Sequence, residues 1–270
     1  GVFGSKHRLR RHPPKETSLF VDPRVSRELF GWYSHRLGLD MPIVRYGTWG
    51  RPLLFLPTAQ ADYLEYERFW LIKSLEPAIL EGRVQVFSVN SINPHAWMNR
   101  KVAIPDAARR QAQYSGYLEE EVVPHIRRCL QSPSVRVGIS GASFGAFYAA
   151  NAFFRRPDLF GTLLAMSGFY DLRPDYLEGF ENDDTYYNNP MQFLRGLTDH
   201  HTLEELRHNS SINIVTGQGA YEAPHASRRL SQLLWDKGIP HNLDVWGHDV
   251  NHDWPWWRKM LPYYVERLGW

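Results

Sequence analysis

The chain has 270 residues, of which 43% are hydrophobic and 22% are charged, and its formal net charge at pH 7 is only +2. A chain of this length buries about 75% of its unfolded surface, which suits one large α/β domain or two small ones. The near-balanced charge gives no reason to expect a nucleic-acid partner, and no apolar run approaches the ~20 residues that span a bilayer, so we expect no membrane partner.

The N-terminal region and the single cysteine bear on where the protein works. Cys129 is the only cysteine, so no internal disulfide can form. This favours a reducing compartment. The first residues contain no apolar signal-like core, and we expect a cytoplasmic protein. Residues 1–28, with a basic run at 6–12, are expected to be a flexible solvated arm; a tail for an anionic partner is the alternative.

The first regular part of the chain is predicted to be an antiparallel opening. Two strands are predicted at residues 30–37 and 41–46, joined by a tight turn at 38–40. A third apolar strand, "PLLFL", is predicted at 52–56. Turn residues between short apolar runs are typical of such strands.

From residue 63 onward, predicted helices and strands alternate. Helices are predicted at 63–75, 106–130 (broken near Gly116 and bent around Pro124), 144–154, 223–237 and 257–268, and strands at 84–89, 135–139, 163–166, 212–215 and 243–246. Strands that alternate with helices pair in parallel, with helices on both faces. The antiparallel start followed by this alternation predicts an α/β fold of the α/β-hydrolase kind, spanning residues 29–270.

One long segment, at about residues 171–208, interrupts the alternation. It is acidic and aromatic and begins "DLRPDYLEGFENDDTYYNNPMQFL". A connection of this length inside a compact domain usually has a function. We expect an excursion over one end of the sheet, as a pocket wall or a lid.

The strongest motif is G-x-S-x-G, present as "GASFG" at residues 141–145. A predicted strand precedes it and a predicted helix follows at once, as a nucleophile elbow requires. The two glycines leave room where strand and helix converge, and the turn lifts the Ser143 hydroxyl off the sheet edge. The N–H of Phe144 then points to where a tetrahedral oxyanion would form. We predict that Ser143 is a nucleophile; a strand-to-helix turn without chemistry is the alternative.

A serine nucleophile needs a base, and the loop after the last predicted strand offers two histidines. This loop reads "GHDVNHDW", with His248 and His252, and both can be argued. The H-D-x-x-H spacing is close to the zinc pattern H-E-x-x-H, which works on a helix. A strand before the loop and Pro255 after it argue against a helix here, so we expect no metal site.

The acid that orients the histidine is expected in the loop after the strand at 212–215, because this fold places the triad in the order Ser, acid, His. Glu222 is the only carboxylate in that loop. A glutamate stabilised by a helix N-terminus is the alternative. The aspartates at 244, 249 and 253 lie too near the histidines in sequence to fit the order.

Two other stretches are expected to shape the site. In the loop after "PLLFL", the backbone N–H of Ala59 or Gln60 is the candidate second oxyanion donor; a plain connecting loop is the alternative. "NPHAWMN" follows the strand at 84–89. Trp97 is predicted to line the acyl or alcohol pocket, and core packing fits equally well. His95 is predicted to contact substrate.

With these residues placed, the chain resembles the esterase D-like family of the α/β-hydrolase superfamily, which includes S-formylglutathione hydrolases, feruloyl esterase domains and antigen 85 mycolyltransferases. The resemblance covers most of the chain, from about residue 33. "GISGASFGAFYAANAFFRRPDLF" is similar to the family's elbow and assigns Ser143 as nucleophile. "GQGAYE" resembles the mycolyltransferases' loop that ends in the acid, which supports Glu222. "HDWPWW" is similar to the family's histidine followed by a small or polar residue and Trp, which selects His252 over His248.

The resemblance also implies an activity. "FLPTAQADYLEYE" resembles a bacterial esterase subgroup in which Ser-Gly-Gly-like residues follow Pro-Thr; Ala59, Gln60 and Ala61 stand in their place. The expected function is cleavage of small-molecule carboxylic esters through an acyl-enzyme, without metal or organic cofactor. Acyl transfer by the same triad, or a non-catalytic binding protein on this scaffold, are the alternatives.

Overall fold

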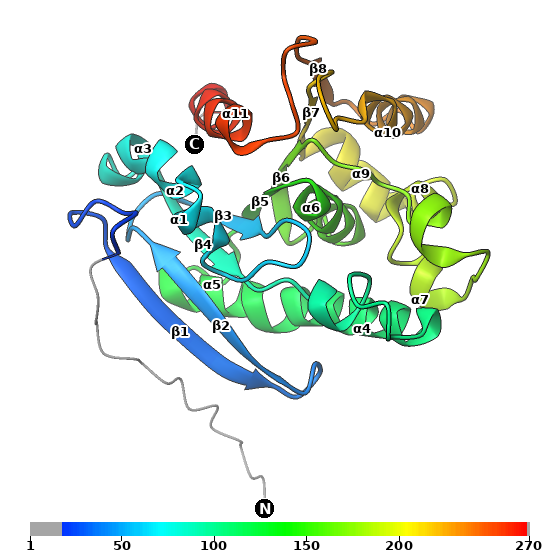
Figure 1. Ribbon diagram of the computed structural model, residues 1–270, viewed down its shortest axis with the longest axis horizontal. Helices are drawn as coiled ribbons and strands as arrows, with labels where there is room; N and C mark the ends of the chain where they lie inside the picture. The colour runs from blue at the N-terminus through cyan, green and yellow to red at the C-terminus, as the bar shows by residue number, and fades with distance from the viewer. Residues whose placement is uncertain (1–17, 269–270) are drawn as a thin grey trace, which may run out of the picture.

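The computed structural model describes residues 18–268. Its centre is an eight-stranded sheet of order β1-β2-β4-β3-β5-β6-β7-β8 (Figure 1). The strands are β1 Arg27–Ser34, β2 Leu39–Tyr46, β3 Arg51–Leu56, β4 Val84–Val89, β5 Val137–Ala142, β6 Phe160–Met166, β7 Ser211–Thr216 and β8 Asn242–Val245. From β4 to β8 all neighbours are parallel, and only the β1–β2 and β2–β4 pairs are antiparallel. The predicted α/β class with a mostly parallel sheet is confirmed.

The predicted three-stranded antiparallel opening is wrong in its third strand. β3 lies between β4 and β5 and runs parallel to both. The reason is burial, since every residue of β3 after Arg51 is buried and such a strand needs a neighbour on each side. The β1–β2 turn also comes earlier than predicted: it ends at Gly38, whose φ is +65°, and Leu39 already pairs with Ser34.

The helices differ from the prediction mainly where the backbone breaks. They are α1 Glu65–Arg68, α2 Leu71–Ser74, α3 Glu76–Leu80, α4 Ile104–Tyr117, α5 Val123–Leu130, α6 Phe144–Arg155, α7 Asp183–Tyr186, α8 Pro190–Phe193, α9 His200–His208, α10 Pro224–Asp236 and α11 Trp254–Arg267. The single helix expected at 63–75 is divided because Trp70 is left-handed, with φ +65°. The helix expected at 106–130 contains a π-helical turn, Leu118–Val122. Pro124 lacks an N–H, so the normal ladder cannot pass through it.

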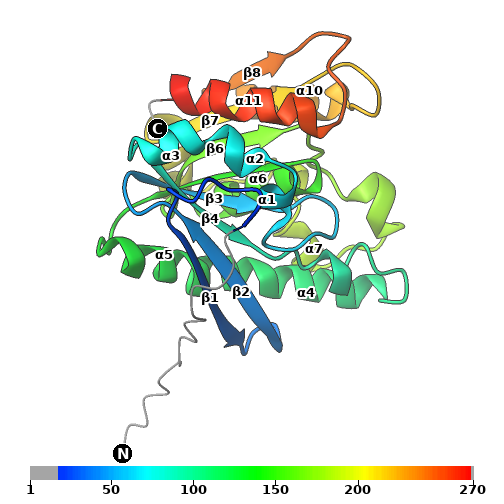
Figure 2. The ribbon, with the colours of Figure 1, turned by 60° about the vertical axis from the view of Figure 1, so that its left-hand side comes forward.

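Helices cover both faces of the sheet. Figure 1 shows α1–α3 and α11 on one side and α4 and α5 on the other, and Figure 2 shows the same arrangement after rotation. Each side has its own cluster of buried hydrophobic side chains. Among residues 18–268, no helix is long and apolar enough to cross a membrane.

The domain begins earlier in the chain than predicted. Most of the predicted arm, residues 1–17, lies outside the described residues. Within the rest of it, Val21 and Val25 are buried in the same cluster as α11, and β1 already begins at Arg27. Two valines that leave water add to the core, so the boundary placed at residue 29 is too late.

Candidate active site

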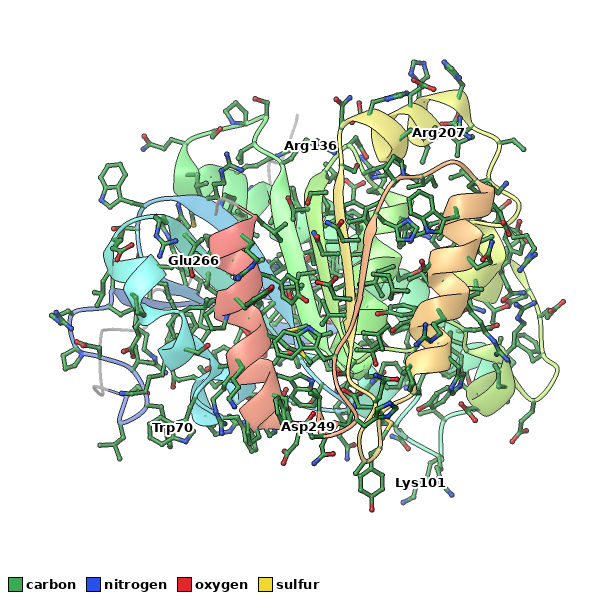
Figure 3. All side chains as sticks on the ribbon, turned by 90° about the horizontal axis from the view of Figure 1, so that it is seen from above. Trp70, Lys101, Arg136, Arg207, Asp249 and Glu266 are labelled. Carbon is green, nitrogen blue, oxygen red and sulfur yellow. The ribbon has the colours of Figure 1, made fainter. Side chains whose placement is uncertain are left out.

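The loops that follow the parallel strands gather at one edge of the sheet. Figure 3 shows Trp70, Lys101 and Asp249, which follow β3, β4 and β8, at one end of the molecule. Arg136 and Arg207, which precede β5 and β7, lie at the opposite end. Carboxyl ends of parallel strands are where open α/β sheets bind ligands.

The elbow sits at this edge, between β5 and α6. Ser143 is the one residue between them and has φ +60° and ψ −125°, a conformation that L-residues rarely adopt. A Cβ added to Gly141 would lie 2.5 Å from the carbonyl carbon of Gly145. A Cβ added to Gly145 would lie 2.6 Å from the Pro57 oxygen. The close approach of β3, β5 and α6 therefore requires both glycines of the motif.

His252 and Glu222 form a hydrogen-bonded chain with this serine. His252 Nε2 is 2.8 Å from Ser143 Oγ, and its Nδ1 is 3.0 Å from Glu222 Oε2. The Glu222 side chain is fully buried, whereas 24% of the His252 side chain is exposed. The His252 ring meets the Trp257 ring edge to face, with centroids 5.0 Å apart. The structure thus brings together the three residues that the sequence singled out.

The second carboxylate oxygen of Glu222 is held by Ser167 and Gly217. Ser167 Oγ lies 2.6 Å from Oε1, and the Gly217 N–H donates to the same oxygen at 3.1 Å. Trp257 Nε1 donates to Ser167 Oγ at 2.9 Å. An indole N–H only donates and a carboxylate only accepts, so the Ser167 hydroxyl must donate to Glu222. Oε2 is left for His252 Nδ1–H, which turns the lone pair of Nε2 toward Ser143.

Sequence reasoning missed Ser167 and Trp257. Ser167 directly follows β6, as Ser143 directly follows β5, and that position next to the neighbouring strand end is the signal that could have found it. Its φ of +54° is another outlier for a residue other than glycine. The prediction that the helix after the histidine loop begins at 257 is also wrong, because α11 begins at Trp254, with the Asp253 carboxylate accepting from the Trp254 N–H.

The acid loop and the histidine loop are joined by main-chain contacts. Gly219 N donates to Val250 O at 2.8 Å, and His252 N donates to Ala220 O at 2.9 Å. The side chain of Asn251 accepts from Ala220 N at 2.8 Å. His248, in contrast, is exposed, and its side chain has no hydrogen-bond partner within the described part of the chain.

The candidate oxyanion donors are free to bind. Within residues 18–268, the N–H groups of Phe144, Ala59 and Gln60 have no acceptor. The neighbouring Thr58 N–H is engaged by Glu65 at 2.9 Å and is not a candidate. Two of the free amides lie in the loop that follows β3 and the third at the start of α6, so each half of an oxyanion hole comes from a different element.

A tyrosine hydroxyl connects the ends of β3 and β5, the two strands that precede the candidate oxyanion donors. Tyr66 Oη donates to Leu56 O at 2.5 Å and accepts from Ala142 N at 3.0 Å. These residues end β3 and β5. Burial raises the pKa of Tyr66 well above its usual value, so the hydroxyl keeps its proton.

Within residues 18–268, neither of the two predicted pocket residues hydrogen-bonds to or stacks on a triad side chain. Trp97 is 8% exposed, its Nε1 donates to Gln111 Oε1 at 2.6 Å, and its ring lies 6.2 Å from that of Tyr176. His95 is exposed at the end of the 3₁₀ turn Asn93–His95. The rings of Phe169 and Tyr176 lie 4.9 Å and 5.4 Å from that of Phe144, the residue after Ser143.

The excursion therefore contributes to the site. Tyr176 belongs to its first turn, Arg173–Leu177, and Leu172 and Leu177 are buried in the core. The segment forms an aromatic wall beside the residue that follows Ser143. Across residues 18–268, no three side chains of the His, Cys, Asp or Glu type gather as a metal-ligand set.

Comparisons with known proteins agree with this architecture. The sequence model of the family described as "Putative esterase" matches residues 82–268. Ferri-bacillibactin esterase BesA of Bacillus subtilis (strain 168) is 29% identical over 112 residues, which cover 42% of this chain and only 33% of that protein.

Solved structures show the same fold at low identity. A ferulic acid esterase superposes with a TM-score of 0.70 at 17% identity, covering 90% of this chain and 98% of that one. An S-formylglutathione hydrolase from Agrobacterium tumefaciens gives 0.68 at 11% identity, covering 92% and 96%. These likenesses establish the α/β-hydrolase fold.

Proposed function

Because this chain belongs to the family described as "Putative esterase", we propose that it is a serine hydrolase that cleaves carboxylic esters through an acyl-enzyme. The observation that carries the proposal is the hydrogen-bonded chain from Ser143 through His252 to Glu222. This series of hydrogen bonds begins at Ser143 on the strained elbow and ends at the buried carboxylate of Glu222.

In the first half of the reaction, Ser143 Oγ attacks the ester carbonyl carbon while His252 Nε2 takes the hydroxyl proton. Glu222 stabilises the imidazolium that forms. The oxyanion receives hydrogen bonds from the N–H of Phe144 and from that of Ala59 or Gln60. When the tetrahedral intermediate collapses, the C–O bond of the ester breaks and His252 gives its proton to the leaving alcohol.

The second half releases the acyl group. Water attacks the acyl-enzyme carbonyl while His252 again takes a proton, and that proton returns to Ser143 Oγ as the carboxylic acid leaves. The transfer between Ser143 and His252 runs between groups already 2.8 Å apart, and none of these steps uses a metal or an organic cofactor. An alcohol that replaces water here would give acyl transfer.

The substrate is proposed to be a small-molecule ester. The rings of Phe144, Phe169 and Tyr176 pack together from the residue after the nucleophile, and the Trp97 ring lies 6.2 Å from that of Tyr176. Aromatic side chains of this kind bury a large apolar area. His95 is proposed to contact the substrate only at the exposed rim.

The decisive experiment replaces the nucleophile. Ser143→Ala should lower kcat on a p-nitrophenyl ester by about 10³-fold or more and abolish labelling by a fluorophosphonate probe, with folding unchanged. Ser140→Ala is the matched control, because Ser140 lies on the same strand and its hydroxyl binds Leu164 O at 2.7 Å. Unlabelled wild-type protein, or an active Ser143→Ala variant, would overturn the proposal. Product analysis with added alcohols separates hydrolysis from acyl transfer.

A further inference from the structure

The loop after β3 must hold its free amides in place without glycine. Ala59 and Gln60 carry the candidate second oxyanion donors. A donor helps only if its direction is fixed before the reaction, because turning it during the reaction costs energy. The contacts that fix this loop therefore bear on catalysis, provided that the proposed esterase function holds.

One side of the loop is fixed by Glu65. Its carboxylate accepts the Thr58 N–H at 2.9 Å and the Thr58 hydroxyl at 2.6 Å, and Glu65 is only 6% exposed. Carbonyl and N–H of one trans peptide point in opposite directions. The Pro57 carbonyl therefore faces away from Glu65, toward the elbow, where it meets the Gly145 backbone.

The other side is fixed by Asn93, which follows β4 and is fully buried. Its side-chain Nδ2 donates to the Ala59 carbonyl. Because an acceptor faces it there, the amide orientation of Asn93 is settled by chemistry. The Ala59 carbonyl is thus directed at Asn93 and the Gln60 N–H away from it. The peptide that carries the Ala59 N–H therefore lies between two fixed peptides: Glu65 holds the one before it and Asn93 holds the one after it.

Asn93 is itself held by the helix of the nucleophile. Tyr148 Oη donates to Asn93 Oδ1 at 2.5 Å. Tyr148 lies one turn after Phe144 on α6, and their rings stack with centroids 5.4 Å apart. Burial raises the pKa of Tyr148 well above its usual value, so its hydroxyl stays a donor. Two hydrogen bonds through the buried Asn93 therefore join the helix that carries one candidate oxyanion donor to the loop that carries the other.

We propose that Asn93 and Tyr148 are positioning residues, which set the distance between the Phe144 N–H and the donor of the loop at Ala59–Gln60. Neither touches the substrate. They act through the Ala59 carbonyl, and their effect belongs to the transition state, because only there does the carbonyl oxygen carry a full charge.

The test compares catalysis with transition-state binding. Asn93→Leu should lower kcat on a p-nitrophenyl ester by about 10- to 100-fold, with KM changed by less than about twofold. Tyr148→Phe leaves the Asn93 donor in place and should lower kcat by about 3- to 10-fold. The inhibition constant of a boronic acid, which forms a tetrahedral adduct with serine, should rise in parallel in both variants. The double variant should resemble Asn93→Leu alone, because the two residues form one chain.

Tyr264→Phe is the matched control. It also removes a buried hydroxyl, which binds Asp244 at 2.6 Å, and should lower the melting temperature without changing kcat or the boronic acid constant. Wild-type protein without activity or labelling would reject the esterase function itself. Active wild-type protein with unchanged kcat in folded Asn93→Leu would overturn this inference alone. If Asn93→Leu does not fold, an unchanged boronic acid constant in Tyr148→Phe overturns it.

Discussion

At the scale of single residues, Ser167 decides which oxygen of Glu222 faces His252. Its hydroxyl is directed to one carboxylate oxygen because Trp257 occupies its acceptor side. The other oxygen is thereby available to His252. A buried carboxylate with fewer donors is more costly to keep charged, so this serine affects both the stability and the orientation of the acid.

Ser167→Ala should therefore lower kcat by about 10-fold with little change in KM, since Glu222 loses one of two donors on Oε1. Trp257→Phe keeps a ring against His252 but removes the N–H, and it should have a smaller effect. Steady-state kinetics on a p-nitrophenyl ester, together with thermal melts, would measure both. A Ser167→Ala variant that only melts earlier would show that this hydroxyl is structural.

The two histidines of the last loop should differ sharply. His252→Ala removes the group that bonds both Ser143 and Glu222, and kcat should fall by about 10³-fold or more. His248→Ala changes an exposed side chain and should leave kcat within about twofold. The same ester assay decides between them, and the reverse ranking would move the base to His248.

At the scale of elements, α1 matters because Tyr66 joins the ends of two parallel strands. Its hydroxyl donates to the Leu56 carbonyl at the end of β3 and accepts from the Ala142 N–H at the end of β5. The two halves of the proposed oxyanion hole are built on these strand ends. Movement of either strand would change their separation.

Tyr66→Phe leaves the Leu56 carbonyl and the Ala142 N–H buried without this partner. The free energy of unfolding should fall by about 1–3 kcal/mol, and kcat should fall as well. Chemical denaturation and ester hydrolysis are the measurements. Stability and turnover equal to those of the wild type would mean that the strand ends are held by other contacts.

The elements also show what sequence could and could not predict. The elbow was predictable because strand, serine and helix are adjacent in the chain, and local sterics decide the glycines. The place of β3 was not, because strand order depends on partners far along the chain. The same holds for the contacts of Ser167 and Asn93: the position of Ser167 after a strand could be read from the sequence, but the partners Glu222 and Ala59 are 55 and 34 residues away. The catalytic roles of the predicted triad stay predictions until the variants are measured.

At the scale of the whole molecule, the antiparallel β1–β2 pair covers a buried histidine. His125 on α5 is 2% exposed and lies against the rings of Phe30 and Trp32. Burial lowers its pKa from the usual 6.5 to about 4, and the positive charges of Arg128 and Arg45 add to this. The folded protein therefore holds His125 neutral.

This predicts a loss of stability in mild acid. The unfolded chain binds a proton at His125 below about pH 6.5, whereas the folded chain does so only near pH 4. The contribution of neutral His125 to the free energy of unfolding is therefore fully present above about pH 6.5. As the pH falls from 6.5 to about 4, this contribution is lost, by up to about 3 kcal/mol. Urea titrations from pH 7.5 to 4.5 would measure the slope, which His125→Leu should reduce. The control His208→Gln changes an exposed histidine and should leave the slope as in the wild type. A wild-type slope in His125→Leu would contradict the assignment to His125.

The strained backbone at the site has a consequence for engineering. Among residues 18–268, six residues other than glycine have positive φ, and Ser143, Ser167 and Tyr221 are three of them. They follow β5, β6 and β7. Directed evolution for heat resistance will therefore meet two kinds of position. Glycine at Gln131, the left-handed residue that ends α5, would relax the backbone far from the chemistry. Glycine at Ser143 would relax the backbone as well but would remove the proposed nucleophile, so heat resistance is better sought at positions such as Gln131.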